Sequence, residues 1–350
     1  MSCSGNSRLT SGDVAEQCCR NVLNELICTE EQYVEDLING IERYSRIFRR
    51  RSTLPPGLVG QQHVLLSNIT EIAALHRHRI LPLMLHHRQQ LELLFERWYS
   101  LVERDFFYCY VLFVANQRNS LHLYHSHELY FKRLQKPMGD PLGIRSFLLK
   151  PVQRIAKYPL LLNRFIQLFF EHRQGISKHV FTLACRLEKR LRELLERANQ
   201  SDQLNDIKNF RVSSILNEAG FVTMGDFQLI DVTLRRCYTC KLFAFNTCII
   251  YTECKGNEQL LRGTFALPDV CFVAKQKSFL LCNKQHECEF LCPLALLKKW
   301  ESIVHRLLEQ CVSMAIGDVA KDTKHYADDT SGQQQVAQRK SINRTIWYTM

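Results

Sequence analysis

The chain has 350 residues, of which 46% are hydrophobic and 23% charged, and its formal net charge is +11. This length and composition predict two globular domains and exclude a collagen-like or low-complexity chain. No stretch approaches the roughly 20 apolar residues that a membrane span needs, and the N-terminus lacks the apolar core of a secretory signal. The 15 cysteines are therefore expected to be free thiols in a reducing, cytoplasmic environment.

The positive charge is concentrated in the first part of the chain. About +8 lies on residues 13–212, whereas residues 213–312 are close to neutral. A basic face suits an acidic protein, an anionic membrane or a nucleic acid, although solvated helix faces account for the charge equally well. A nucleic-acid binder needs aromatic residues between the exposed basic ones, but the aromatic residues here fall on core stripes, so no nucleic-acid partner is expected.

Residues 13–210 carry apolar side chains at every third or fourth position, which is the helical period. This period predicts a bundle of long helices that pack lengthwise. The expected helices span residues 13–50, 61–79, 85–100, 104–136, 142–173 and 176–209, after a disordered tail at residues 1–12.

The first predicted helix contains a charged residue on its apolar stripe. Glu30 falls in the gap of a stripe formed by Leu23, Ile27, Val34, Leu37, Ile41 and Phe48. A carboxylate in that position must be paired, hydrogen-bonded or turned toward something other than the core. The pattern alone favours an intramolecular salt bridge over contact with a partner.

The segment LLKPVQRIAKYPLLL, residues 148–162, has helical spacing, two prolines and two apolar-flanked polar residues. One stripe is a core stripe: Ile144, Leu148, Pro151, Ile155, Tyr158, Leu162, Phe165 and Phe169. The second stripe consists of Leu149, Gln153, Lys157, Leu160 and Arg164. It mixes apolar and polar groups, which suits a protein-binding surface. The prolines are expected to bend the helix. The alternative is a kinked bundle helix in which Lys157 reaches water.

In the last predicted helix, Asn199 follows four leucines at core spacing, so it is either a helix-end cap or a polar contact group.

After about residue 213 the pattern changes to that of strands. Residues 236–254 read as a hairpin with its turn at Asn246-Thr247, further short strands follow, and Pro293 opens a final amphipathic helix. We expect residues 213–312 to form a small antiparallel β barrel or sandwich closed by that helix, and residues 313–350 to form a disordered tail.

The sequence gives little support for a metal site or for covalent chemistry. Cys237 and Cys240 form a C-x-x-C, but on a strand residues three apart point to opposite faces. The histidine clusters at 76/78, 86/87 and 122/125/127 lack acidic or thiol partners at fitting spacing and are expected on helix surfaces. No phosphate-loop, H-E-x-x-H or G-x-S-x-G motif occurs, so no cofactor, metal or catalytic residue is predicted.

Residues 148–162 resemble the most characteristic segment of the Dbl-homology domain, the module with which one family of exchange factors acts on Rho-type GTPases. NVLNELICTEEQYVEDL, residues 21–37, resembles its first-helix signature, and the β region with LKKWESIVHRLL resembles a pleckstrin-homology domain. The similarity covers about residues 15–312. It implies a Dbl-homology domain at 13–210 followed by a pleckstrin-homology domain at 213–312.

The resemblance implies a guanine nucleotide exchange factor that binds both switch regions of a Rho-family small GTPase and releases GDP. It assigns the GTPase contact to Glu30, Val34, Leu149, Gln153, Lys157, Leu160 and Asn199. Glu30 would meet switch I, and Lys157 and Asn199 would meet the switch II region. Leucine at 149 favours Cdc- or Rho-type over Rac-type partners. The alternative is a non-catalytic adaptor of the same fold, which binds a GTPase or a membrane without exchange.

The β domain is expected to attract anionic membranes weakly. Its first segment, GFVTMGDFQLID at 220–231, has no basic residue, and Arg235 and Arg236 come late for a phosphoinositide site. We therefore expect a cytoplasmic protein with at most peripheral contact at the plasma membrane.

Overall fold

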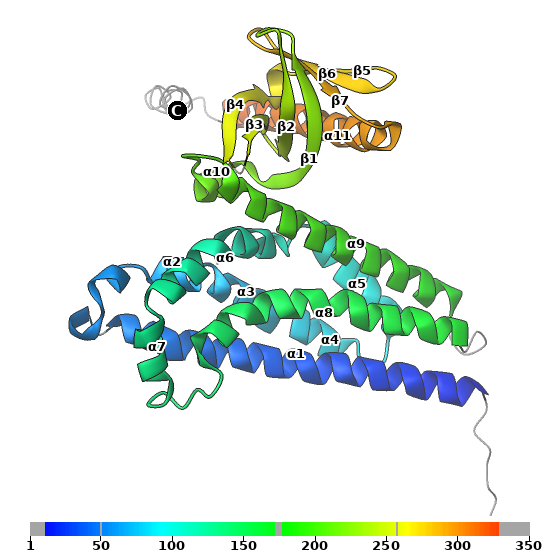
Figure 1. The fold of residues 1–350 in the computed structure, drawn as a ribbon. Coiled ribbons are helices and arrows are strands. Elements are labelled where there is room, and N and C mark those ends of the chain that lie inside the picture. The colour runs from blue at the N-terminus through cyan, green and yellow to red at the C-terminus, as the bar shows by residue number, and fades with distance from the viewer. Residues whose placement is uncertain (1–10, 50, 172–176, 257, 329–350) are drawn as a thin grey trace, which may run out of the picture. The chain divides into compact units, whose positions relative to one another are not determined.

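The computed structural model describes residues 11–49, 51–171, 177–256 and 258–328 (Figure 1). The chain forms two compact units. The first comprises residues 1–227 and 238–264, and the second comprises residues 228–237 and 265–350.

The first unit is built mainly from long helices, which confirms the predicted bundle. α8 packs against α1 and α9, and α9 also packs against α5 and α6 (Figure 1). The long helices are α1 (Ser11–Arg49), α5 (Leu91–Glu103), α6 (Tyr108–Ser126), α8 (Gly143–Glu171) and α9 (Lys178–Asp202). Shorter ones are α2 (Gln62–Leu66), α3 (Ile69–Leu75), α4 (Leu81–His86), α7 (Glu128–Gln135) and α10 (Val212–Ala219).

The prediction of a single helix over residues 61–79 is wrong. Ser67 has φ of +48°, a left-handed conformation that an L-residue rarely adopts and that ends α2. The chain then starts again as α3, passes through a π turn at His76–Ile80 and continues as α4. Ser67 thus ends the helix although the apolar residues on both sides of it keep the helical period.

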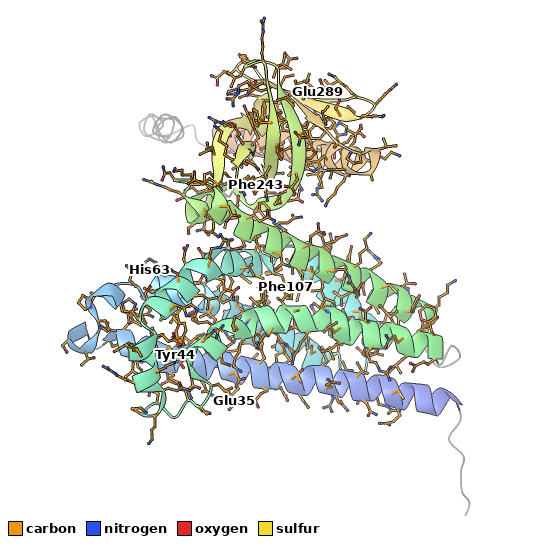
Figure 2. All side chains as sticks on the ribbon, viewed as in Figure 1. Glu35, Tyr44, His63, Phe107, Phe243 and Glu289 are labelled. Carbon is orange, nitrogen blue, oxygen red and sulfur yellow. The ribbon has the colours of Figure 1, made fainter. Side chains whose placement is uncertain are left out.

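Close approach between α1 and α8 depends on a small residue. A Cβ atom added to Gly40 would lie 2.1 Å from Cε2 of Phe147, so only glycine lets that ring lie against α1. Tyr44, one turn further along α1, stacks on the same ring at 5.4 Å. Side chains such as Tyr44 and Phe107 fill the space between the helices (Figure 2). Helices α1 and α8, which carry all the predicted partner contacts except Asn199, are therefore packed tightly together.

A seven-stranded sheet has the order β4-β3-β2-β1-β7-β6-β5, and the pairs β1–β7, β2–β3, β5–β6 and β6–β7 are antiparallel. The strands are β1 (Phe221–Asp231), β2 (Arg236–Phe245), β3 (Cys248–Lys255), β4 (Glu258–Ala266), β5 (Cys271–Ala274), β6 (Ser278–Cys282) and β7 (Glu287–Leu291). The hairpin predicted at Asn246-Thr247 is confirmed by β2 and β3. The sheet is not closed, so of the two expected forms it is not the barrel.

The predicted change from helix to strand comes a few residues later than residue 213. Residues 212–219 form α10, in which Leu216 and Ala219 are buried, and Gly220 ends it with φ of +64°. The hydroxyl of Tyr108 donates to the Leu216 carbonyl at 2.8 Å. These helical contacts explain why V-S-S-I-L-N-E-A follows the helical period rather than the strand period.

The final helix, α11 (Leu294–Asp328), covers the second unit, where it contacts β5 and β6. The amide of Leu297 donates to the Pro293 carbonyl at 3.0 Å, so the proline opens the helix as predicted. Trp300, Val304 and Leu307 are buried. The helix continues past residue 312, where a disordered tail was expected, and residues 329–350 lie outside the described part. Within the described residues, no helix combines the length and hydrophobicity needed to cross a bilayer.

Candidate functional site

The mixed stripe predicted on residues 149–164 lies on the outside of α8. Gln153 and Lys157 are exposed, and Leu160 is 67% exposed, a large fraction for an apolar side chain. Leu149 is half-buried. Steps of three and four residues place these side chains on one side of the helix. We call these four residues the α8 outer face.

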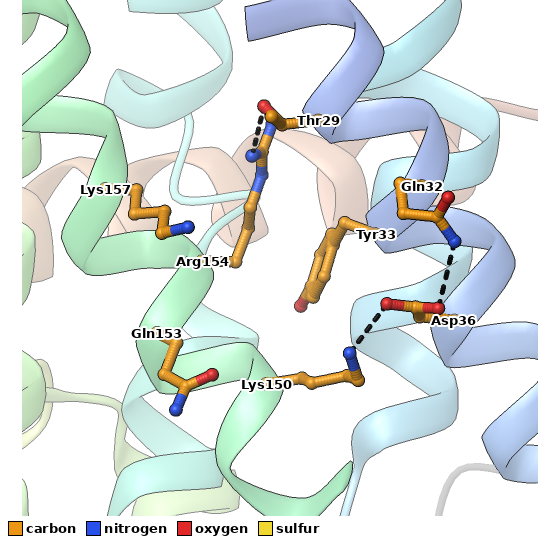
Figure 3. Close-up of a pocket in the computed structure, with 8 residues that line it drawn as sticks. All are labelled: Thr29, Gln32, Tyr33, Asp36, Lys150, Gln153, Arg154 and Lys157. Carbon is orange, nitrogen blue, oxygen red and sulfur yellow. Dashed lines mark hydrogen bonds and ion pairs between the residues drawn. The ribbon is translucent and has the colours of Figure 1, made fainter. Parts of the chain in front are cut away.

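The α8 outer face borders a hollow of about 220 Å³ between α1 and α8 (Figure 3). Its walls are Thr29, Gln32, Tyr33 and Asp36 from α1 and Lys150, Gln153, Arg154 and Lys157 from α8. The ammonium of Lys150 donates to Asp36 at 2.6 Å, and Gln32 donates to the same carboxylate group at 3.1 Å. The hollow thus offers donors and acceptors from two rigid helices, with Lys157 at its edge.

Glu30 does not belong to this surface, which corrects the prediction that it contacts a partner. Its side chain has no exposed area, and Arg154 donates to its Oε2 through Nε at 2.8 Å. The hydroxyl of Tyr158 donates to the same oxygen at 2.6 Å, and Nδ1 of His76 lies 2.6 Å from Oε1. The intramolecular salt bridge that spacing alone favoured is the arrangement found.

His76 extends this buried network, so the expectation that it lies on a helix surface is wrong. Its Nε2 lies 2.8 Å from the hydroxyl of Tyr110, which in turn lies 3.2 Å from the hydroxyl of Tyr33. The imidazole packs parallel to the ring of Tyr158, at 12°. Every member of the chain from Arg154 to Tyr33 therefore has a hydrogen-bonding partner, as buried polar groups require.

The network keeps the Glu30 carboxylate ionised. Burial raises its pKa, but His76, Arg154 and the Tyr158 hydroxyl together outweigh burial and lower the pKa to about 2. Burial and the adjacent Glu30 charge raise the pKa of Tyr158, so its phenol remains a donor. The bundle therefore contains a buried charged pair. Removal of one partner would leave the other charge uncompensated in an apolar core.

The remaining two predicted contact residues differ in exposure. Val34 is only 5% exposed, because it continues the buried stripe of α1, and this corrects its assignment to a partner surface. Asn199 is exposed in the last turn of α9, and Gln203, not Asn199, is the C-cap residue of that helix. Exposure leaves Asn199 available as a polar contact group.

Sequence reasoning missed Arg154, Asp36 and Lys150. A signal for Arg154 existed, because it lies three residues after Pro151 and four before Tyr158, both on the core stripe. A cation on the core side of α8 is the natural partner of a carboxylate on the core side of α1. The Asp36–Lys150 pair had no comparable signal, since both residues read as ordinary exposed charges.

The described residues hold no cluster of three or more histidine, cysteine, aspartate or glutamate side chains placed to bind a metal ion. Cys237 is exposed whereas Cys240 is buried, consistent with opposite faces of β2. The chemistry that this surface offers is hydrogen bonding, charge and apolar contact with a macromolecule.

The model of the RhoGEF domain matches residues 22–175. Over 149 residues the chain is 34% identical to human Pleckstrin homology domain-containing family G member 4B, which covers 42% of this chain and 9% of that protein. Over 179 residues it is 28% identical to human Rho guanine nucleotide exchange factor 25, which covers 50% of this chain and 30% of that protein. The chain thus spans less than a third of the length of these curated relatives.

A solved complex of PDZ-RhoGEF DH/PH domains with GTP-gamma-S activated RhoA matches with a TM-score of 0.48 and 16% identity, covering 87% of this chain and 96% of that one. The order of elements agrees with the sequence-based expectation: a helical region, then a seven-stranded sheet, then a long helix. Residues 22–175 therefore match the RhoGEF domain, and over that part the chain is similar to curated Rho guanine nucleotide exchange factors.

Proposed function

We propose that this chain is an exchange factor for Rho-family small GTPases and that the α8 outer face is part of its GTPase-binding surface. The observation that carries the proposal is the exposure of Gln153, Lys157 and Leu160 side by side on the RhoGEF domain, next to the hollow between α1 and α8. Leu160 is 67% exposed between Lys157 and Arg164, an arrangement unusual for a helix face that contacts only water. A protein interface combines such apolar and charged groups.

Release of GDP needs no covalent step from this chain. The α8 outer face and Asn199 bind both switch regions of the GTPase more tightly when the nucleotide is absent. By thermodynamic linkage, a partner that prefers the empty form lowers nucleotide affinity by the same factor. Lys157 supplies a positive charge for acidic groups near switch II, and Leu160 supplies apolar area beside it.

Glu30 contributes to this function from inside the bundle. Through Arg154 it joins α1 to α8, and Arg154 also donates to the Thr29 hydroxyl at 2.9 Å on the wall of the hollow. Glu30 therefore fixes the spacing of the two helices that present the surface, and switch I is met by exposed groups of the hollow, such as Gln32 and Asp36.

Leu149 bears on the choice of GTPase. It is half-buried at the start of the α8 outer face, so a partner meets its apolar edge rather than a full side chain. We propose that it favours Cdc- or Rho-type over Rac-type partners, which a panel of purified GTPases loaded with fluorescent GDP would test directly.

The decisive experiment compares Lys157→Ala with Lys189→Ala, a change of an exposed lysine on α9 whose side chain is 79% accessible. Loss of a desolvated charged contact costs about 2 kcal/mol or more, so nucleotide release is expected to slow roughly 30-fold for Lys157→Ala and to remain normal for Lys189→Ala. Equal rates for both variants and the unaltered chain would refute the role of Lys157. Tight binding of nucleotide-free GTPase without any release would instead indicate the adaptor.

We also propose that the protein is cytoplasmic and meets anionic membranes only weakly. The segment 220–231 without basic residues supports this. Sedimentation with phosphatidylserine vesicles, with and without phosphoinositide, should give weak binding that salt abolishes; tight headgroup-specific binding would contradict the proposal.

A further inference from the structure

Two cysteines lie directly opposite each other near the edge of the sheet. Cys271 begins β5, an edge strand, and its Cα partner on β6 is Cys282. Cys271 is exposed and Cys282 is half-buried. The Cys282 thiol donates to the Cys271 carbonyl at 3.9 Å, so its sulfur is turned toward the strand that carries the other thiol.

The hairpin turn fixes the spacing of this pair. The Lys275 amide donates to the Ser278 carbonyl at 2.8 Å, which makes residues 275 and 278 a hydrogen-bonded pair. Counting by twos along both strands places Cys271 and Cys282 in another hydrogen-bonded position, where Cα atoms lie about 5.5 Å apart. That separation falls within the range found for disulfides.

We propose that Cys271 and Cys282 form a reversible, redox-sensitive disulfide whose oxidant is a low-molecular-weight disulfide such as oxidised glutathione. The exposed thiol meets the oxidant and the half-buried thiol resolves the adduct. The cysteine pair lies in the second unit, whereas the α8 outer face lies in the first.

The exchange balances without any further reagent. The Cys271 thiolate attacks one sulfur of the glutathione disulfide, forming a mixed disulfide and releasing one glutathione thiolate, which takes up the proton. The Cys282 thiolate then attacks the Cys271 sulfur and releases the second glutathione. The protein loses two electrons and two protons, and the disulfide is reduced to two thiols. Burial and its contact with the Cys271 side chain raise the pKa of Cys282, so the second step accelerates with rising pH.

Strain is expected to make this disulfide easy to reduce, so that it is reversible rather than permanent. Opposite Cβ atoms in hydrogen-bonded pairs lie about 5 Å apart, further than the ~3.8 Å that a relaxed disulfide prefers. Closing the bond must therefore pull the strands together, and strained bonds are easily reduced. Because the pair lies at the end of the hairpin away from its turn, oxidation would hold the beginning of β5 against β6.

The test incubates the whole reduced chain with oxidised glutathione at several pH values, blocks free thiols with N-ethylmaleimide and maps peptides by mass spectrometry. The expected product is a peptide pair joined through Cys271 and Cys282 and lighter by two hydrogens, which excess reduced glutathione returns to free thiols. Amide hydrogen exchange of residues 271–274 should slow in the oxidised form.

Variants assign the two roles. Cys282→Ser should trap glutathione on Cys271, whereas Cys271→Ser should lose the cross-link and leave Cys282 free. Cys28→Ser, which removes an exposed thiol from α1, should leave the cross-link intact. A wild-type chain that keeps glutathione on Cys271, that pairs Cys271 with another cysteine, or that does not react would overturn the proposal.

Discussion

The inner and outer faces of α8 carry similar residue types but have opposite roles. Arg154 and Lys157 are both basic and only three residues apart, yet Arg154 has 4% of its area exposed and Lys157 points to solvent. Arg154 satisfies a buried carboxylate on α1, whereas Lys157 borders a hollow at the surface. Charge on an apolar helix therefore indicates a partner, but only the tertiary structure says whether that partner lies within the chain.

The same contrast separates two ion pairs that join α1 to α8. Glu30–Arg154 is sealed in the core, whereas Asp36–Lys150 has about 30% of each side chain exposed. Breaking a buried pair leaves an uncompensated charge in an apolar medium, but water compensates the partners of an exposed pair. Changes to the buried pair should therefore lower the free energy of unfolding more than changes to the exposed pair.

Arg154→Met should be the most damaging change. It preserves much of the side-chain volume but leaves the Glu30 carboxylate buried without its guanidinium. We expect the free energy of unfolding of the helical domain to fall by about 3–5 kcal/mol, measured by urea denaturation followed by circular dichroism. A loss below 1 kcal/mol would show that the pair is not sealed. Combining the change with Glu30→Gln should recover part of the loss, because no charge is then stranded.

Stability should depend on pH through Glu30. Its folded pKa of about 2 lies below the ordinary value of 4.5, so its stabilising contribution is complete above about pH 4.5 and is lost as pH falls toward 2. The full contribution of such a shift is about 3 kcal/mol. Urea denaturation at pH 6, 4 and 3 should show a steeper loss for the unaltered chain than for Glu30→Gln. Parallel curves would contradict the role of Glu30.

Asp36→Asn should have a small effect on stability. It removes the charge that Lys150 meets at 2.6 Å, but both partners remain in contact with water. We expect a change in the free energy of unfolding of about 0–1 kcal/mol, which shrinks further in 1 M salt. A loss comparable with that of Arg154→Met would remove the distinction between the two pairs.

Lys157→Ala should alter stability least. The side chain is exposed, so the expected change in the free energy of unfolding is within about 0.5 kcal/mol. Thermal melting monitored beside the nucleotide-release assay would separate a lost contact from a damaged fold. If the melting temperature falls together with the rate of nucleotide release, the slower release reflects a destabilised fold rather than a lost GTPase contact.

The sequence correctly predicted a helix over residues 148–162 and which of its sides faces the core. Helical spacing predicted that Ile155 and Tyr158 are buried and that Gln153 and Leu160 are exposed, as the structure has them. The prediction was possible because side-chain direction repeats every 3.6 residues in any helix. The hairpin at Asn246-Thr247 was predictable from two strand-like runs that flank a short polar turn. The break at Ser67 was not, since a positive φ at a serine has no reliable local signal.

Amino-acid order by itself determined the helical and β regions, the outer stripe of α8 and the need for something to satisfy Glu30. Only the tertiary structure decided that the partners are Arg154, 124 residues away, and His76, 46 residues away, and that Cys271 faces Cys282. Periodicity is a local property that each segment carries alone. Pairing between distant segments depends on how the packed helices and strands align, which no single segment encodes.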